Sequence, residues 1–239
     1  MSAKVGVVFV SHSPQIAAGM VALAGQMAGS VALVAAGGTD DDGIGTSFTK
    51  VMSGVAEADG GAGVVVISDL GSALLTAETV LDMLDEEQRA RVRVVDVPFV
   101  EGGVAAAVAA ESGGSLDDVV AAAEGAVDAW AGKAGGASVD AVTAPDSSAE
   151  APADGPYERE VLVRNPEGLH ARPAAEFVKL ANTFPAKVTV NGKDAKSLLG
   201  IMSLGLTAGS TARIATDTPD GRPAVDALAD LVDTGFGEL

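Results

Sequence analysis

The first half of the chain alternates short β-branched runs with longer stretches in which apolar residues recur at helical spacing. The β-branched runs cover residues 5–11, 31–37, 63–70 and 91–98. Helical spacing follows at residues 14–29, 47–58 and 72–88, and after residues 102–114 a last helix is expected from Ser115 through Trp130. The runs are apolar at consecutive positions, as in strands buried on both faces. This alternation predicts an α/β domain, a parallel sheet with helices on both faces.

The second half has a different pattern. Strands are expected at residues 157–165 and 210–217, and helices at residues 171–184, 197–205 and 223–236. Residues 186–196 read as a hairpin, because Asn191-Gly192 suits a tight primed turn. Antiparallel strands with helices on one face predict an α+β layer structure.

Residues 131–156 separate these two patterns. The stretch is rich in Ala, Gly, Ser, Pro and Asp and has no sustained apolar period, which is typical of a flexible linker. We therefore expect one domain over residues 1–130, a linker over 131–156 and a second domain over 157–239.

Composition narrows the classes of function. The formal net charge of the 239 residues is -18, which argues against nucleic acid as a partner and favours a partner with a basic face. The absence of cysteine excludes disulfides and thiolate chemistry, and the spacing of the only two histidines suggests no metal site. The apolar run after Lys4 is too short for a signal peptide or a membrane span, so we expect a cytoplasmic protein.

One of the two histidines, His170, precedes the helix expected at residues 171–184. Pro173 suits the first turn of a helix, which puts the histidine near the helix N-terminus. Unpaired N–H groups and the helix dipole favour an anion there, and Arg172 adds a fixed positive charge. A neutral imidazole could accept a phosphoryl group at this position, although the same spacing also suits a histidine that only caps or packs.

The other histidine, His12, ends the first strand and should lie at the carboxyl edge of the parallel sheet, where ligands collect in such folds. Asp69 and Ser72 follow the third strand and should reach the same edge. Asp69 could accept the proton of one ring nitrogen and leave the other free to attack phosphorus, or it could simply cap a turn.

A Gly-rich loop follows the second strand. Its Gly37, Gly38 and Thr39 could present backbone and hydroxyl donors to a phosphate, although a loop of this composition is ordinarily only a turn. The chain contains no dinucleotide fingerprint, P-loop lysine pattern or nucleophile elbow.

From Tyr157 to Leu239 the chain resembles a known family. The segments NPEGLHARPAAEFVKLA, NGK and AKSLLGIMSLGL closely resemble HPr, the phosphocarrier of the bacterial phosphoenolpyruvate phosphotransferase system. The resemblance implies an open-faced β-sandwich. It also implies that His170 is the phosphorylated histidine, Arg172 the phosphate-stabilising arginine and Asn165 the asparagine near the active-site loop.

The same resemblance implies roles for the short apolar helix. Leu198, Leu199 and Met202 match an exposed apolar patch that docks on partners, unless this helix face packs into the core. Ser197 aligns with the serine used for regulation in some Gram-positive members.

From Ala3 to Trp130 the segments VVFVSHSPQIAAGMVALAGQMA, AAGGTDDDGIGTS, SDLGSALLTAE and VPFVEGGVAAAVAA carry a second resemblance. They are similar to mannose-type enzyme IIA domains, and more closely to the phosphotransfer subunits of dihydroxyacetone kinase. The family resemblance implies that this domain forms a homodimer.

Together the two resemblances imply a phosphoryl relay. Enzyme I, charged by phosphoenolpyruvate, would phosphorylate His170, which would pass the group to His12. Phospho-His12 would rephosphorylate ADP on the nucleotide-binding kinase subunit, which phosphorylates dihydroxyacetone bound on a third subunit. The scheme needs no bound cofactor, since phosphoenolpyruvate is the ultimate donor. Because the chain ends before any enzyme I-like domain, we expect enzyme I in trans, with separate HPr as a further candidate partner.

Two other functions remain open at this point. The same histidines could serve a sugar transporter by passing phosphate to the cytoplasmic domain of a permease. Alternatively, the protein could be a regulator that is phosphorylated and then binds a transcription factor or an enzyme.

Overall fold

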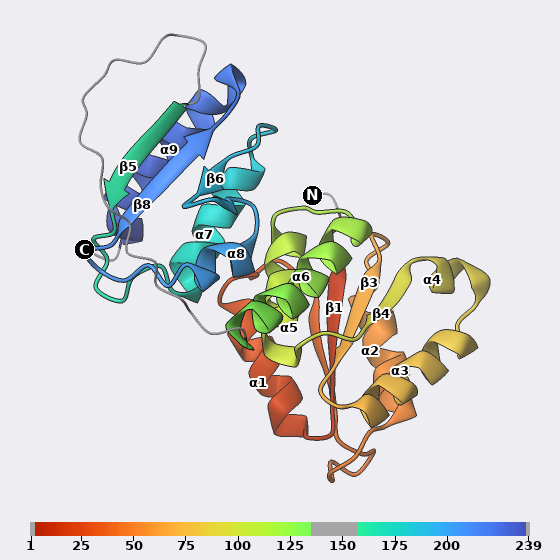
Figure 1. Ribbon diagram of the computed structural model, residues 1–239. Helices are drawn as coiled ribbons and strands as arrows, with labels where there is room; N and C mark the ends of the chain where they lie inside the picture. The colour runs from red at the N-terminus through yellow and green to blue at the C-terminus, as the bar shows by residue number, and fades with distance from the viewer. Residues whose placement is uncertain (1–2, 135–156, 238–239) are drawn as a thin grey trace. The chain divides into compact units, whose positions relative to one another are not determined.

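The computed structural model describes residues 3–134 and 157–237. The chain divides into two compact units, Met1–Asp128 and Ala129–Leu239, called here the N-terminal and C-terminal units (Figure 1). Of the segment expected to be a linker, residues 131–134 belong to helix α6 (Leu116–Ala134). The rest of that segment, residues 135–156, lies outside the described residues.

Four parallel strands form the sheet of the N-terminal unit, in the order β2-β1-β3-β4 (Figure 1). They are β1 (Gly6–Ser11), β2 (Leu33–Gly37), β3 (Val64–Ser68) and β4 (Val92–Val95). Every residue of β1 and β3 is buried, because each central strand has a neighbour on both sides and helices above and below. The predicted parallel sheet is confirmed.

Helices cover both faces of this sheet. α1 (Pro14–Gly25) and α5 (Phe99–Glu111) pack together on one face, and α2 (Phe48–Ala58) and α3 (Gly71–Met83) pack together on the other (Figure 1). The core under α2 and α3 consists almost entirely of Val and Ala side chains, as the low aromatic content requires.

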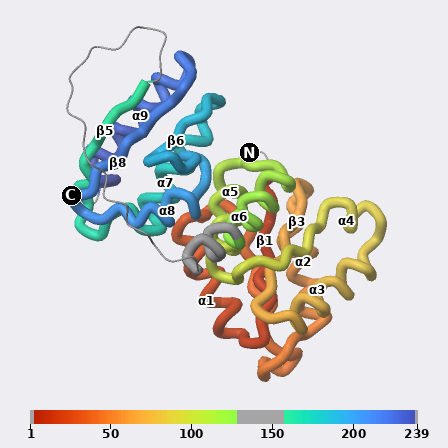
Figure 2. Tube along the Cα trace, in the orientation of Figure 1, coloured from red at the N-terminus to blue at the C-terminus, as the bar shows by residue number. Residues whose placement is uncertain are grey.

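The helix expected at residues 72–88 is two helices. α3 ends at Met83, and α4 (Glu86–Ala90) begins after Asp85, whose carboxylate accepts the Gln88 N–H at 2.8 Å. The Cα trace separates the two segments (Figure 2). An aspartate inside an apolar periodic stretch can cap a new helix, and here the N-cap interaction replaces helix continuation.

A charged cluster fixes the end of the sheet opposite to His12. Glu111 accepts hydrogen bonds from the Ser30 hydroxyl at 2.7 Å and the Ser30 N–H at 3.1 Å, and its carboxylate lies 3.2 Å from Lys4 Nζ. Burial raises the pKa of the Glu111 carboxyl, but the bonds from Ser30 and Lys4 outweigh burial and lower the pKa from 4.5 to about 2. This carboxylate therefore stabilises the N-terminal unit while it is ionised.

The C-terminal unit contains a four-stranded antiparallel sheet in the order β5-β8-β6-β7 (Figure 1). Its strands are β5 (Tyr157–Leu162), β6 (Thr189–Val190), β7 (Lys193–Asp194) and β8 (Thr211–Thr216). Asn191 and Gly192 have φ angles of 47° and 81°, so both central residues of the β6-β7 turn are left-handed. The predicted primed turn is confirmed.

Helices α7 (Ala171–Asn182) and α9 (Arg222–Asp233) pack against each other on one face of this sheet, and α8 (Leu198–Ser203) packs on α7 (Figure 1). Residues of β5 and β8 alternate between buried and solvent-facing positions, so the other face of the sheet is open. This is the expected open-faced α+β sandwich. In the described part of the chain, no helix is long and apolar enough to cross a membrane.

Candidate functional site

His12 lies between a buried strand and a helix. It follows Ser11, the last residue of β1, and precedes Ser13, the N-cap of α1, whose hydroxyl accepts the Ile16 N–H at 3.4 Å. Pro14 occupies the first helical position, where a missing N–H has no cost. The imidazole is thus held at the carboxyl edge of the sheet, partly open to solvent.

Both ring nitrogens of His12 have hydrogen-bond partners. Nδ1 lies 3.0 Å from Asp69 Oδ1, and Nε2 lies 2.7 Å from the Ser72 hydroxyl. The other Asp69 oxygen, Oδ2, accepts the backbone N–H of His12 at 2.9 Å. β1 and β3 are parallel neighbours, so their carboxyl ends meet at one edge. The structure therefore brings together the three residues that sequence reasoning assigned to this edge.

The Asp69 carboxylate is stabilised in its ionised form. Burial raises its pKa, but hydrogen bonds from the His12 ring, the Ser11 hydroxyl and the His12 N–H outweigh burial and hold the pKa below the usual value. An ionised carboxylate can only accept hydrogen bonds, so the proton of a neutral His12 ring lies on Nδ1. Nε2 then keeps its lone pair, and the Ser72 hydroxyl donates to it.

Nε2 of His12 faces the start of a helix. Ser72 is in the first turn of α3, whose N-cap, Leu70, has no side-chain cap. The first N–H groups of a helix have no acceptor within the helix, and the dipole favours negative charge there. A phosphoryl group on Nε2 would therefore lie beside suitable donors.

The Gly-rich loop after β2 does not present the predicted phosphate donors. The Gly38 N–H donates to the Ser11 carbonyl at 3.0 Å, and the Thr39 N–H donates to the Gly43 carbonyl at 3.0 Å. The Thr39 hydroxyl donates to Asp41. Backbone carbonyls and a local carboxylate therefore already accept hydrogen bonds from Gly38 and Thr39, and this hydrogen bonding does not support the predicted phosphate role of these two residues.

The same loop instead positions the histidine. The Gly45 N–H donates to the His12 carbonyl at 2.9 Å, and the Thr46 hydroxyl lies 2.9 Å from that of Thr76 on α3. Gly37, also predicted to donate a hydrogen bond to a phosphate, is the last residue of β2. Its carbonyl oxygen accepts a hydrogen bond from Lys50 Nζ at 3.1 Å. The loop thus joins β1, β2 and α3 around His12.

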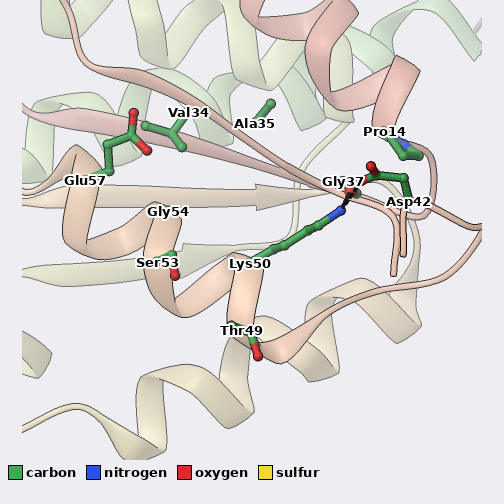
Figure 3. Close-up of a pocket in the computed structure, with 10 residues that line it drawn as sticks. All are labelled: Pro14, Val34, Ala35, Gly37, Asp42, Thr49, Lys50, Ser53, Gly54 and Glu57. Atoms are coloured by element: carbon green, nitrogen blue, oxygen red, sulfur yellow. Dashed lines mark hydrogen bonds and ion pairs between the residues drawn. The ribbon is translucent and has the colours of Figure 1, made fainter. Parts of the chain in front are cut away.

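A groove of about 380 Å³ runs beside β2 (Figure 3). Lys50 extends across it from α2 and also pairs with Asp42 at 2.6 Å. His12 does not line this groove, so the groove is distinct from the histidine site.

Four large apolar side chains on the segments that hold His12 and Ser72 are exposed to solvent. We call Ile16, Ile44, Leu70 and Leu75 the apolar rim; their exposed fractions are 52%, 78%, 61% and 63%. Ile16 is in the first turn of α1, Ile44 precedes the Gly45 that binds the His12 carbonyl, and the two leucines flank Ser72. Several exposed large apolar side chains on neighbouring segments are typical of a protein interaction surface.

Acidic side chains lie at the same edge. Asp40, Asp41 and Asp42 are in the loop after β2, Asp96 follows β4, and Glu101 is in the first turn of α5. A partner that docks here would be attracted through basic side chains.

In the C-terminal unit, His170 is the N-cap of α7, with extended backbone at φ -75° and ψ -176°. Its ring is partly exposed, and Nε2 lies 3.9 Å from Glu167 Oε2. Arg172 is in the first helical turn, and its Nε lies 3.8 Å from Glu176 Oε1. Pro173 is buried in that turn, so the predicted position of His170 at a helix N-terminus is observed.

A tight loop presents His170. Gly168 has a φ of 71°, and a Cβ there would lie 2.3 Å from the Leu206 carbonyl oxygen. That oxygen accepts the Leu169 N–H at 2.8 Å. Asn165 is buried, and its side-chain amide donates to the Gly168 carbonyl. Asn165 therefore shapes the loop from within, while sequence reasoning gave no indication of the Leu206 contact.

The predicted docking patch on α8 requires a correction. Leu198 and Leu199 are only 4% and 7% exposed, whereas Met202 is 37% exposed. A six-residue helix needs most of its apolar side chains to attach it to the unit, so the two leucines pack inward. Ser197 is exposed and caps α8 by accepting the Gly200 N–H at 3.1 Å.

A role for Ser11 and the exposure of the apolar rim were not predicted from the sequence. Ser11 is polar at a buried strand position directly before His12, which is a readable signal. Exposure of the rim depends on tertiary packing. No group of three or more His, Cys, Asp or Glu suited to a metal ion occurs within residues 3–134 and 157–237.

Two known families match the chain, one within each unit. Residues 6–120 match the family described as "PTS system fructose IIA component", and residues 157–234 match "PTS HPr component phosphorylation site".

Individual relatives resemble the whole chain or one unit. The phosphoryl donor subunit DhaM of PEP-dependent dihydroxyacetone kinase from Escherichia coli is 36% identical over 98% of this chain and 51% of its own length. The phosphotransferase subunit DhaM of Lactococcus lactis is 35% identical over 48% of this chain and 89% of its own length. Phosphocarrier protein HPr of Vibrio cholerae is 44% identical over 32% of this chain and 95% of its own length. The chain spans about half the length of the curated relatives that it matches from end to end.

Proposed function

The chain belongs to the DhaM family of phosphotransfer subunits, and from this premise we propose that it is a phosphoryl relay of a PEP-dependent dihydroxyacetone kinase. His170 accepts a phosphoryl group from enzyme I, the group moves to His12, and His12 delivers it to ADP on the nucleotide-binding kinase subunit. That subunit then phosphorylates dihydroxyacetone held by a third subunit.

The observation that carries this proposal is the hydrogen bonding of the His12 ring. Asp69 accepts from Nδ1 at 3.0 Å, so the lone pair lies on Nε2, which faces the first turn of α3. A ring held in one tautomer and aimed at an anion-binding helix end is suited to carry a phosphoryl group.

The chemistry at His12 balances without a metal ion or a separate base. The Nε2 lone pair attacks phosphorus, the N–P bond of the donor imidazole breaks, and its electron pair returns to the donor nitrogen. The Nδ1 proton stays on the ring, where the Asp69 carboxylate stabilises the positive charge that develops. In the second step a β-phosphate oxygen of ADP attacks phosphorus, and the Nε2–P bond breaks. Donor and acceptor nitrogens are chemically alike in the first step, so positioning is the main demand.

At His170 the helix N-terminus performs the corresponding role. The ring sits at the N-cap of α7, where N–H groups can hold phosphate oxygens. Arg172 is solvent-exposed in the first turn and free to reorient toward a bound phosphate from its 3.8 Å contact with Glu176.

Partners of the N-terminal unit dock on the apolar rim. The four exposed apolar side chains and the surrounding carboxylates call for a partner face that is apolar at its centre and basic at its edge. We extend the proposal to a cytoplasmic homodimer formed through the N-terminal unit, with phosphoenolpyruvate as the ultimate donor and no bound cofactor. The dihydroxyacetone kinase names of the relatives along the full chain favour this function over a sugar transporter or a regulator.

The deciding experiment measures whether the phosphoryl group on this protein is transferred to ADP on the kinase subunit. Chain phosphorylated with ³²P is mixed with the nucleotide-binding subunit loaded with ADP, and the label is followed into ATP. We expect rapid loss of label from His12. Retention of the label with ADP present, combined with its transfer to a permease domain, would contradict the proposal.

A further inference from the structure

Ser11 is a fully buried polar residue next to the reactive histidine. Its exposed fraction is 0%, and its hydroxyl donates to Asp69 Oδ2 at 2.7 Å. The Ser11 hydroxyl oxygen also accepts the backbone N–H of Ser13, the N-cap of α1, at 3.1 Å. The hydroxyl therefore connects the start of a helix to the carboxylate that binds the His12 ring.

The donors along this connection can be assigned one after another. A backbone N–H can only donate, so the Ser11 oxygen accepts from Ser13 and its single proton goes to Asp69. The His12 N–H also donates to Oδ2, at 2.9 Å, so two donors occupy that oxygen. Oδ1 is left for the proton on Nδ1, which puts the lone pair on Nε2 and makes Ser72 the donor to it.

We propose that Ser11 is a positioning residue, which acts through Asp69 to fix the orientation of the carboxylate and thereby the tautomer of His12. A carboxylate rotates easily about its terminal torsion, and two donors on one oxygen prevent that rotation. The inference rests on the proposed function for its catalytic consequence, but the tautomer itself can be measured in the unphosphorylated protein.

A purely structural role would be to satisfy the Ser13 N–H. That role predicts lower stability when Ser11 is replaced, with no specific change in the His12 ring. The experiment must therefore read the ring directly.

The chain has only two histidines, so imidazole ¹⁵N signals in a His170→Ala background come from His12 alone. We expect a protonated Nδ1 and an unprotonated Nε2 at a pH where the ring is neutral. Ser11→Ala should shift both signals toward the average of the two tautomers, and Ser11→Thr, which keeps the hydroxyl, should restore them. Ser13→Ala is the matched control, because it removes a neighbouring cap hydroxyl and leaves the Ser13 N–H in place; its ring signals should match those of the parent.

Phosphorylation rates supply a second readout, measured with His170 present. Ser11→Ala should slow phosphorylation of His12 about tenfold, the effect of losing one hydrogen bond to a charged group. In an Asp69→Asn background the same change should alter the rate less than about twofold, because the carboxylate through which Ser11 acts is already lost.

Ser11→Ala signals identical to those of the parent would overturn the proposal, as would an equal shift in Ser13→Ala. If Ser11→Ala does not fold, Ser11→Cys decides, since it keeps the side-chain size but donates weakly and should shift the signals part of the way. If no variant is phosphorylated but Ser11→Ala still shifts the signals, the relay fails while the role of Ser11 stands.

Discussion

Replacing Asp69 by Asn tests how the site selects its nucleophile. The Ser11 hydroxyl and the His12 N–H both donate to Oδ2, at 2.7 and 2.9 Å, so the amide oxygen must take that position. The amide NH₂ group then occupies the position of Oδ1, 3.0 Å from Nδ1. It can only donate there, so it requires the lone pair on Nδ1 and the proton on Nε2. The variant should therefore hold the wrong tautomer.

The magnitude follows from two losses. A hydrogen bond to a charged group contributes about 1.5–3 kcal/mol, and the reversed tautomer adds a comparable cost to bring the lone pair back to Nε2. At about 1.4 kcal/mol for each factor of ten, the two losses together should slow phosphorylation of His12 by about 10²- to 10⁴-fold.

Rapid-quench measurement of phospho-His12, with phosphorylated HPr as donor, determines the rate. Asp117→Asn is the matched control, because it removes the same charge from an exposed position in the first turn of α6, outside the acidic group assigned to docking; its rate should stay within about twofold of the parent. An Asp69→Asn rate within threefold of the parent, in a folded protein, would show that Asp69 does not set the tautomer of His12.

Three other substitutions test separate parts of the structure. Glu111→Gln should destabilise the N-terminal unit in urea unfolding by about 3 kcal/mol at pH 7 and by little at pH 2. The reason is that a pKa lowered from 4.5 to about 2 gives stability that is present above pH 4.5 and is lost as the pH falls toward 2. Equal losses of stability at both pH values would contradict this role of the Glu111 carboxylate. Gly168→Ala should slow phosphorylation of His170 by about tenfold or more in a labelling assay, since a Cβ cannot fit 2.3 Å from a carbonyl oxygen at a φ of 71°; an unchanged rate would show that the loop tolerates the shift. Ile44→Asp should weaken binding to the nucleotide-binding kinase subunit about tenfold in calorimetry, whereas Met83→Asp, at a similarly exposed position at the far end of α3, should not. Equal effects of the two substitutions would argue against docking on the apolar rim.

The sequence predicted the His12 site because parallel strands impose a geometry. Residues that follow β1 and β3 must meet at one edge, so the approach of Asp69 and Ser72 to His12 follows from strand order alone. The position of His170 follows in the same way from the helix-start pattern around Pro173.

The sequence could not predict which donors remain available or which apolar side chains stay exposed. The Thr39 hydroxyl is used by Asp41 because the loop folds back on itself. Leu199 is buried and Ile44 is exposed although both are apolar, because burial depends on contacts with elements far away in the sequence. The division between α3 and α4 depends on Asp85 acting as a cap, which competes closely with helix continuation.

One labelling experiment determines whether phosphate enters at His170 before it reaches His12. Parent, His12→Ala and His170→Ala proteins are incubated with phosphoenolpyruvate and enzyme I, and the phosphorylated residue is identified by mass spectrometry. We expect label on both histidines of the parent, label on His170 in His12→Ala, and none in His170→Ala until separate HPr is added, when His12 becomes labelled. Labelling of His12 in His170→Ala by enzyme I alone would contradict this order of transfer.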